Sequence, residues 1–94
     1  MKVILRLSAK PEKIEELKRI LVGLAAPTRT EVGCVSWEVF QNRAEPGDLT
    51  VVEEWASDAA LDAHWATLHV QDALARATPL LAAAPDERRY LKIA

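Results

Sequence analysis

The residues best suited to chemistry in this chain lie within residues 50–70, which hold both histidines and two of the three tryptophans. His64 is the strongest candidate, because a neutral imidazole can accept a proton and return it near neutral pH. Glu53 precedes it on a segment with strand-like alternation, and a carboxylate beside an imidazole orients the ring and keeps it basic. We therefore predict His64 and Glu53 as catalytic residues, with His64 as the proton acceptor.

A structural role remains open for both residues. His64 sits on an apolar helical stripe, where a core histidine can be satisfied by a backbone carbonyl or by a carboxylate. Glu53 could equally be an edge-facing glutamate paired with a surface base. His69 follows five residues after His64, which is about 140° around an ideal helix. Because this spacing does not make a metal-binding i,i+4 pair and no third ligand is evident, we expect no metal site.

Three tryptophans, Trp37, Trp55 and Trp65, could line a pocket that binds a flat aromatic compound by stacking. They could also simply be large core residues. The sequence has no glycine-rich phosphate loop and no nucleophilic serine elbow, and Cys34 is its only cysteine. We therefore expect no flavin, nicotinamide or nucleotide cofactor.

The first half of the chain is expected to form a strand, a helix and a second strand. Lys2–Ser8 alternates apolar and polar residues, and Pro11 suits the first position of a helix. Apolar residues recur at helical spacing after it, and Pro27 is expected to kink or end that helix. Residues 34–41 form the second predicted strand. The helical stripe consists of Ile14, Leu17, Leu21 and Leu24.

The second half is expected to repeat a strand, a helix and a strand. A turn at 42–48 precedes the strand 49–56, and Ser57 then suits the N-cap of a helix. Leu61, His64, Trp65 and Leu68 form one stripe of that helix. Thr67 could cap a second helical piece that runs through Ala77. A connection between Pro79 and Pro85 leads to a last strand at 88–93.

This βαββαβ order predicts an α+β fold, the ferredoxin-like split βαβ sandwich, in a single domain covering residues 1–94. The four-stranded antiparallel sheet would carry both helices on one face. Ile4, Phe40 and Val52 would then point away from the helices, leaving an apolar second face. We therefore predict a homodimer packed sheet to sheet.

Composition argues against several other classes of partner, although a local basic patch stays open. The 94 residues carry a formal net charge of −2, which gives no broad basic surface for nucleic acid. No apolar run approaches the roughly 20 residues that span a bilayer, and the N-terminus does not resemble a signal sequence. We expect a cytoplasmic protein that binds neither nucleic acid nor membranes.

Several short motifs resemble the antibiotic biosynthesis monooxygenase (ABM) domain, and in particular its quinol monooxygenase-like members. The most specific is the block Glu53-x-Trp55, then Ser57-x-x-Ala60-Leu61-Asp62-Ala63-His64, then His69. Lys10-Pro11-Glu12 and Glu31-Val32-Gly33-Cys34 are similar to two further family motifs, although Val32 stands where many members have proline. The first strand also lacks an asparagine that some oxygenases of the family carry. Haem-degrading members rely on that asparagine, so its absence and the His64/His69 spacing argue against that branch.

The resemblance implies a dimeric α+β barrel with a pocket between sheet and helices in each subunit. It also implies oxidation of quinols, anthrones or similar aromatics by O₂ without flavin or metal. Glu53 and His64 would line the pocket, and His69 would be a second candidate near its mouth. We predict a cofactor-independent monooxygenase whose partners are a small aromatic substrate and O₂. Two alternatives stay open: a small-molecule isomerase using the same base, and a non-catalytic dimeric ligand-binding module.

Overall fold

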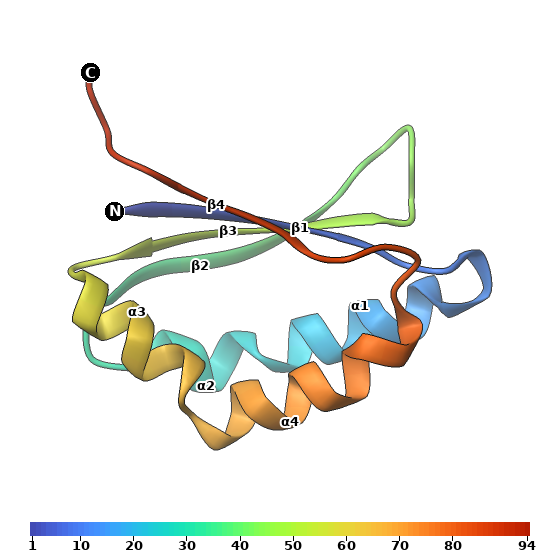
Figure 1. Cartoon of the computed structure of the whole chain (residues 1–94), viewed down its shortest axis with the longest axis horizontal. Coiled ribbons are helices and arrows are strands. Elements are labelled where there is room, and N and C mark those ends of the chain that lie inside the picture. The colour runs from blue at the N-terminus through green and yellow to red at the C-terminus, as the bar shows by residue number, and fades with distance from the viewer.

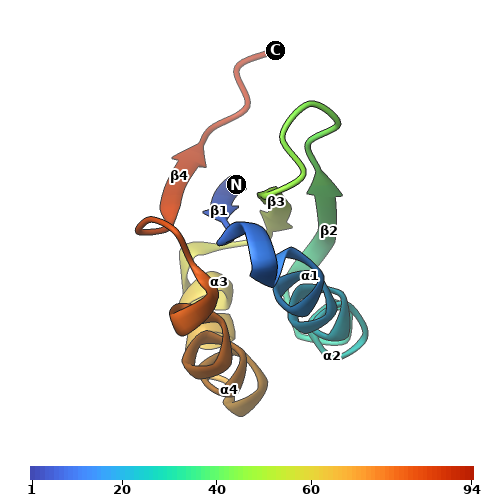
Figure 2. The same cartoon turned by 90° about the vertical axis from the view of Figure 1, so that its right-hand side faces the viewer.

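The protein, described here by a computed structural model of residues 1–94, places a four-stranded sheet against one layer of helices (Figures 1 and 2). All strand pairs are antiparallel, and the strand order is β2-β3-β1-β4. This is the predicted ferredoxin-like arrangement. The elements are β1 (Lys2–Ser8), a 3₁₀ turn η1 (Pro11–Lys13), α1 (Ile14–Gly23), α2 (Ala25–Arg29), β2 (Cys34–Gln41), β3 (Asp48–Trp55), α3 (Asp58–Trp65), α4 (Leu68–Ala77), η2 (Thr78–Leu80) and β4 (Asp86–Tyr90).

The central strands bury one face against the helices, as their alternation predicts. Leu49, Val51, Glu53 and Trp55 of β3 are each at most 1% exposed. Their neighbours on the strand point the other way, and Val52 is only partly covered. In β2 the alternation fails at Val35, which is 60% exposed, because a bulge between Cys34 and Ser36 shifts the register there.

The first helical segment differs from the prediction at Pro27. The helix breaks at Leu24, whose N–H turns back to the carbonyl of Leu21, and a second helix, α2, then runs through Pro27. Pro27 is tolerated because it is the third residue of α2, where a backbone N–H would have no partner within the helix. The expected end at Pro27 is therefore wrong, and the break lies three residues earlier.

The helical region after β3 is broken at Thr67. Ser57 Oγ accepts a hydrogen bond from the N–H of Ala60 at 3.1 Å, which confirms the predicted N-cap of α3. Thr67 has extended backbone angles and caps α4 through the N–H of Val70. Because the chain changes direction between the two helices, the angle expected between His64 and His69 on one continuous helix does not apply.

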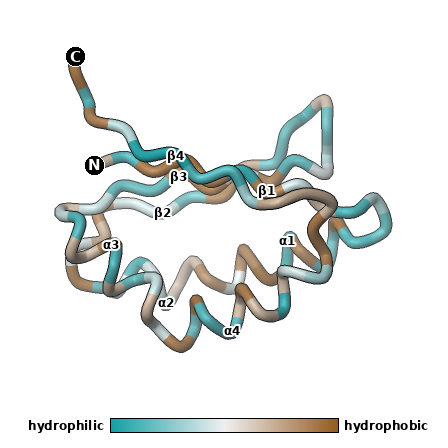
Figure 3. The backbone as a smooth tube through the Cα atoms, in the orientation of Figure 1, coloured by the Kyte–Doolittle hydropathy of each residue, from teal (hydrophilic) through white to brown (hydrophobic).

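The last strand covers Asp86–Tyr90 rather than the expected 88–93. Its end is set by β1, because Tyr90 pairs with Lys2 and no residue of β1 remains to pair beyond it. The chain then leaves the sheet on the side away from the helices, with Leu91 and Ile93 more than 80% exposed (Figures 1 and 3). None of the helices combines the length and apolarity needed to cross a membrane.

Candidate functional site

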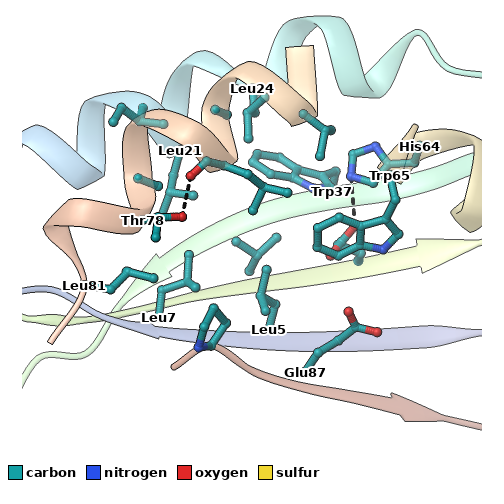
Figure 4. A pocket seen from close by; sticks show the side chains of 18 residues that line it. Leu5, Leu7, Leu21, Leu24, Trp37, His64, Trp65, Thr78, Leu81 and Glu87 are labelled. Carbon is teal, nitrogen blue, oxygen red and sulfur yellow. Dashed lines mark hydrogen bonds and ion pairs between the residues drawn. The ribbon is translucent and has the colours of Figure 1, made fainter. Parts of the chain in front are cut away.

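A cavity of about 350 Å³ lies between the sheet and the helices (Figure 4). Of its 18 lining residues, 13 are hydrophobic, including Leu5, Leu7 and Leu21. This volume is at the lower end of the range for small-molecule pockets, which are mostly apolar with a few placed polar groups. The cavity therefore has the size and character of a binding site for a small, largely apolar compound.

His64 lies at one end of this cavity, held by α3 in a buried position, with 4% of the residue exposed. Its Nδ1 atom is 2.9 Å from Oε2 of Glu31, and its Nε2 atom is 3.7 Å from Oε1 of Glu53. The Trp55 ring lies against it, with ring centroids 4.6 Å apart. A carboxylate on Nδ1 fixes the Nδ1–H tautomer of a neutral imidazole, which leaves the lone pair on Nε2. His64 therefore has the arrangement of an oriented base.

Glu31 reaches His64 because the loop between α2 and β2 packs closely against α3. Gly33 in this loop has φ +85°, and a Cβ atom there would lie 2.5 Å from the Cβ of Ala60. The Gly33 carbonyl accepts a hydrogen bond from the N–H of Ala56 at 2.8 Å, which ties the loop to the end of β3. Glycine is required here both for its backbone conformation and for the close approach.

His69 contacts the same carboxylate oxygen from the other side. Its Nε2 atom is 2.8 Å from Oε2 of Glu31, and its side chain is 29% exposed, compared with 5% for His64. His69 does not line the main cavity but a polar hollow on the helical layer, beside residues such as Glu16 and Arg19. His64 and His69 therefore share Glu31 as a partner. Glu31 is a third group that could bind a metal beside the two histidines, so the expectation that no third ligand is evident is wrong.

Glu31, His64 and His69 are also the residues that could hold a metal ion. One ligand atom from each lies within 4.8 Å of the others, and imidazole and carboxylate groups suit several transition metals. The two nitrogen–oxygen distances of 2.9 and 2.8 Å are those of hydrogen bonds. A carboxylate accepting from two imidazoles satisfies all three groups by itself, so the absence of a metal stays our prediction.

Glu53 is buried on β3 with 1% of the residue exposed. Its Oε1 atom accepts a hydrogen bond from Nε1 of Trp55 at 3.0 Å. Burial raises the pKa of Glu53, and the Trp55 hydrogen bond and the nearby His64 oppose this rise. Glu53 also lines the cavity, so it can share a proton with His64 next to a bound compound.

The three tryptophans have different surroundings. Trp37 and Trp65 line the cavity, where their rings can contact a flat ligand (Figure 4). Trp55 is fully buried and outside the cavity lining, where it supports Glu53 and packs on His64. The Nε1 atom of Trp65 is buried and has no hydrogen-bond partner within the protein.

Sequence reasoning missed Glu31 and Glu87 as site residues. Glu31 belongs to the short motif before the second strand, and its position in that motif was the available signal. Glu87 lines the cavity from β4 and was hidden because the last strand was expected to start two residues later.

Comparison with known proteins places these features in a family. The profile described as antibiotic biosynthesis monooxygenase matches residues 1–76. The chain is 33% identical to Putative monooxygenase Rv0793 of Mycobacterium tuberculosis, over 84% of this chain and 77% of that protein. It is 31% identical to Putative monooxygenase YcnE of Bacillus subtilis, over 85% and 84% of the two chains. It is also 32% identical to the uncharacterized protein sll1783 of Synechocystis, and the match covers 94% of this chain but only 59% of that protein.

Solved structures agree with this relationship. A crystal structure titled antibiotic biosynthesis monooxygenase superposes with a TM-score of 0.94 at 28% identity, covering 99% of this chain and 98% of that one. The structure of Rv0793 from Mycobacterium tuberculosis superposes with a TM-score of 0.88 at 29% identity, covering 99% and 96%. The sequence match and the shared fold together show that this chain belongs to the antibiotic biosynthesis monooxygenase family.

Proposed function

We propose that this protein is a cofactor-independent monooxygenase that oxidises a quinol, an anthrone or a similar electron-rich aromatic with O₂. Family membership and the names of its relatives support a monooxygenase-like function. The observation that carries the finer proposal is the buried His64, which borders an apolar cavity while its Nδ1 faces Glu31 and its Nε2 faces Glu53.

In this proposal His64 removes the proton that keeps the substrate unreactive. With an anthrone, a proton passes from the ring carbon to Nε2 of His64, and the resulting carbanion reacts with O₂. The peroxide then takes up a proton and loses water, which leaves the quinone, so one oxygen atom enters the product and the other leaves as water. The apolar cavity excludes bulk water during these steps, which favours a delocalised anion over side reactions.

Glu31 acts as the positioning residue for His64. A carboxylate on the far nitrogen of an imidazole holds the ring in one tautomer and stabilises the imidazolium that forms, as in a serine protease triad. The second hydrogen bond, from His69, holds the Glu31 carboxylate in place. Glu53 lies near the other ring nitrogen of His64, Nε2, on the side of the cavity where the substrate would bind.

The direct test is O₂ uptake by metal-free protein with a panel of reduced quinols and anthrones and no added cofactor. We expect uptake above autoxidation that falls about 100-fold or more in His64→Ala, the usual contribution of a general base. Glu12→Gln, a change at an exposed position of η1 outside the cavity lining, is the control. Uptake that survives in a folded His64→Ala protein would contradict the assignment of the base.

The same assay separates the alternatives. An isomerase that uses His64 would convert its substrate equally well under nitrogen. A ligand-binding module would bind an aromatic compound and form no product. Product formation only in the presence of O₂, with consumption of O₂, supports the monooxygenase.

A further inference from the structure

The cavity is lined by two carboxylates and by no lysine or arginine. Apart from hydrophobic residues and Pro85, its lining consists of Glu53, His64, Thr78 and Glu87. The Thr78 hydroxyl donates to the carbonyl of Leu74, so it is already engaged. Among the titratable and hydroxyl side chains of the lining, the groups left to interact with a ligand are therefore two carboxylates and an imidazole.

The two carboxylates lie on the same face of the sheet and are separated by β1. Glu53 of β3 pairs with Val3, and Glu87 of β4 pairs with Leu5 on the other side of the same strand. Two strand spacings and an offset of two residues along β1 separate their backbones by about 12 Å. Glu53 is fully buried, whereas the Glu87 side chain is 28% exposed on the edge strand, on the side of the cavity where Trp65 lies (Figure 4). Glu87 therefore marks the outer end of the cavity.

Arg89 is a cationic group paired with one of the lining carboxylates, so its charge is already balanced. Its Nε atom is 2.7 Å from Oε1 of Glu87. That hydrogen bond, together with the charges of Glu87, Asp62 and Asp58, raises the pKa of Arg89. On the other side of the cavity, the Nδ1 atom of His64 faces Glu31. An anionic ligand would therefore find no free lysine or arginine among the lining residues or their ion-pair partners.

We propose that this cavity selects uncharged aromatic ligands with hydroxyl or amide donors and rejects anionic ones, and that Glu87 sets this selection. A hydroxyl or amide N–H of the ligand would donate to Glu87, and a second donor could reach Glu53. A buried carboxylate or phosphate on the ligand would lose its hydration and gain no free counter-ion, because Glu87 already holds Arg89. The choice of an aromatic ligand rests on the proposed function, whereas the charge selection rests on the lining.

Binding of three matched bicyclic probes tests this selection without any need for turnover. The probes are 2-naphthol, 2-naphthamide and 2-naphthoate at neutral pH, measured by isothermal titration calorimetry. The amide and the carboxylate have nearly the same shape and differ in charge. We expect the wild-type protein to bind naphthol and naphthamide at least about ten-fold more tightly than naphthoate.

Two substitutions should change this preference in graded steps. Glu87→Gln releases Arg89, and Glu87→Lys also adds a second cation at the outer end of the cavity. Compared with the wild-type protein, we expect Glu87→Gln to bind naphthoate a few-fold more tightly and Glu87→Lys to bind it at least about ten-fold more tightly. The affinity for naphthamide should change little. Glu12→Lys makes the same change of net charge at an exposed position of η1 outside the cavity lining, and screening should keep its ratio of naphthamide to naphthoate affinity within about two-fold of wild type.

Three results would overturn the proposal. They are equal binding of naphthoate and naphthamide to wild type, an equal response to Glu12→Lys and Glu87→Lys, or no binding of any probe. Selective binding without O₂ consumption by any quinol or anthrone would instead leave the selection intact and count against the monooxygenase. The two proposals can therefore fail separately.

Discussion

The carboxylate of Glu31 lies 2.9 Å from Nδ1 of His64, although the two residues are 33 positions apart in the chain. The pairing is not local, because Glu31 lies in the loop before β2 and His64 on the helix after β3. The pair forms because this loop packs against α3, with Gly33 beside Ala60. It gives His64 the orientation that a proton acceptor needs.

Replacing Glu31 with Gln should therefore slow the reaction without emptying the cavity. We expect O₂ uptake to fall about 100-fold or more, because Gln cannot stabilise the imidazolium and can hold the wrong tautomer. ¹⁵N NMR of the imidazole nitrogens reports the tautomer directly, and naphthamide binding checks that the cavity is intact. If uptake stays within about two-fold of wild type in a folded Glu31→Gln protein, Glu31 does not position the base.

Metal removal and metal addition should have opposite effects. We expect dialysis against a chelator to leave O₂ uptake unchanged, because His64, Glu31 and His69 satisfy one another without an ion. Added Zn²⁺ should inhibit, since two imidazoles and a carboxylate can rearrange around it and remove His64 from its role as base. His69→Gln should weaken this inhibition. Loss of activity on chelation, restored by one specific metal, would show a metal enzyme instead.

Stability should depend on pH through Glu53. Burial raises its pKa above the ordinary value of 4.5, so the folded protein holds this proton over a range where the unfolded chain has released it. The free energy of unfolding should therefore fall as pH rises above about 4.5 and level off above the raised value. Glu53→Gln keeps an acceptor for the Trp55 indole and has no charge to bury, so this part of the pH dependence should vanish.

Urea denaturation of both proteins between pH 4.5 and pH 8 measures the effect as a difference, because other titrating groups are common to both. The wild-type protein should lose stability relative to Glu53→Gln as pH increases. A constant difference over this range would mean that Glu53 is not held protonated by the fold.

Gly33 should be the glycine least tolerant of substitution. Gly33→Ala forces a side chain into a conformation with positive φ and into the Cβ of Ala60, so we expect a loss of about 2 kcal/mol or more in the free energy of unfolding. Gly23→Ala is the matched control, because a Cβ there meets nothing within 4 Å and alanine favours the helix. It should stabilise by about 0.5 kcal/mol. Similar effects of the two changes in thermal or urea denaturation would contradict this reading of the loop.

The outer face of the sheet is expected to hold the partner of a homodimer. Ile4 and Val52 lie there on the two central strands, and Phe40 and Tyr90 beside them are 51% and 45% exposed. Val52→Glu would place a charge in that interface, so light scattering should show a dimer for wild type and a monomer for the variant. Val22→Glu, at an exposed position of α1, should leave the mass unchanged. A monomeric wild-type protein would refute the prediction.

The sequence predicted the elements that depend on local pattern. The strand β1 and the caps at Ser57 and Thr67 follow from alternation and side-chain type, and the structure has them where expected. The inward face of β3 followed from the same alternation. Features that depend on distant segments were not predictable, such as the end of β4, which is set by the length of β1.

The candidate site residues likewise fall into those that local pattern predicts and those that depend on distant contacts. His64 and Glu53 were found because their chemistry and their faces can be read locally. The roles of Glu31 and Trp55 depend on how a loop and a strand meet α3, and no spacing in the sequence reports this. Alternation places Trp37 and Trp55 on the same inward face of the sheet, yet only Trp37 lines the cavity. This difference likewise depends on where the cavity lies relative to each strand.

The cavity borders the hydrophobic core of the domain, because Leu7, Leu21 and Trp37 belong both to its lining and to the cluster of buried core residues. A ligand would therefore complete the packing of the domain. Folding and recognition then draw on the same apolar surfaces, so any compound that fits should raise the melting temperature, and the rise should grow with the logarithm of its concentration divided by its Kd. A thermal-shift screen can thus search for the natural substrate before its reaction is known.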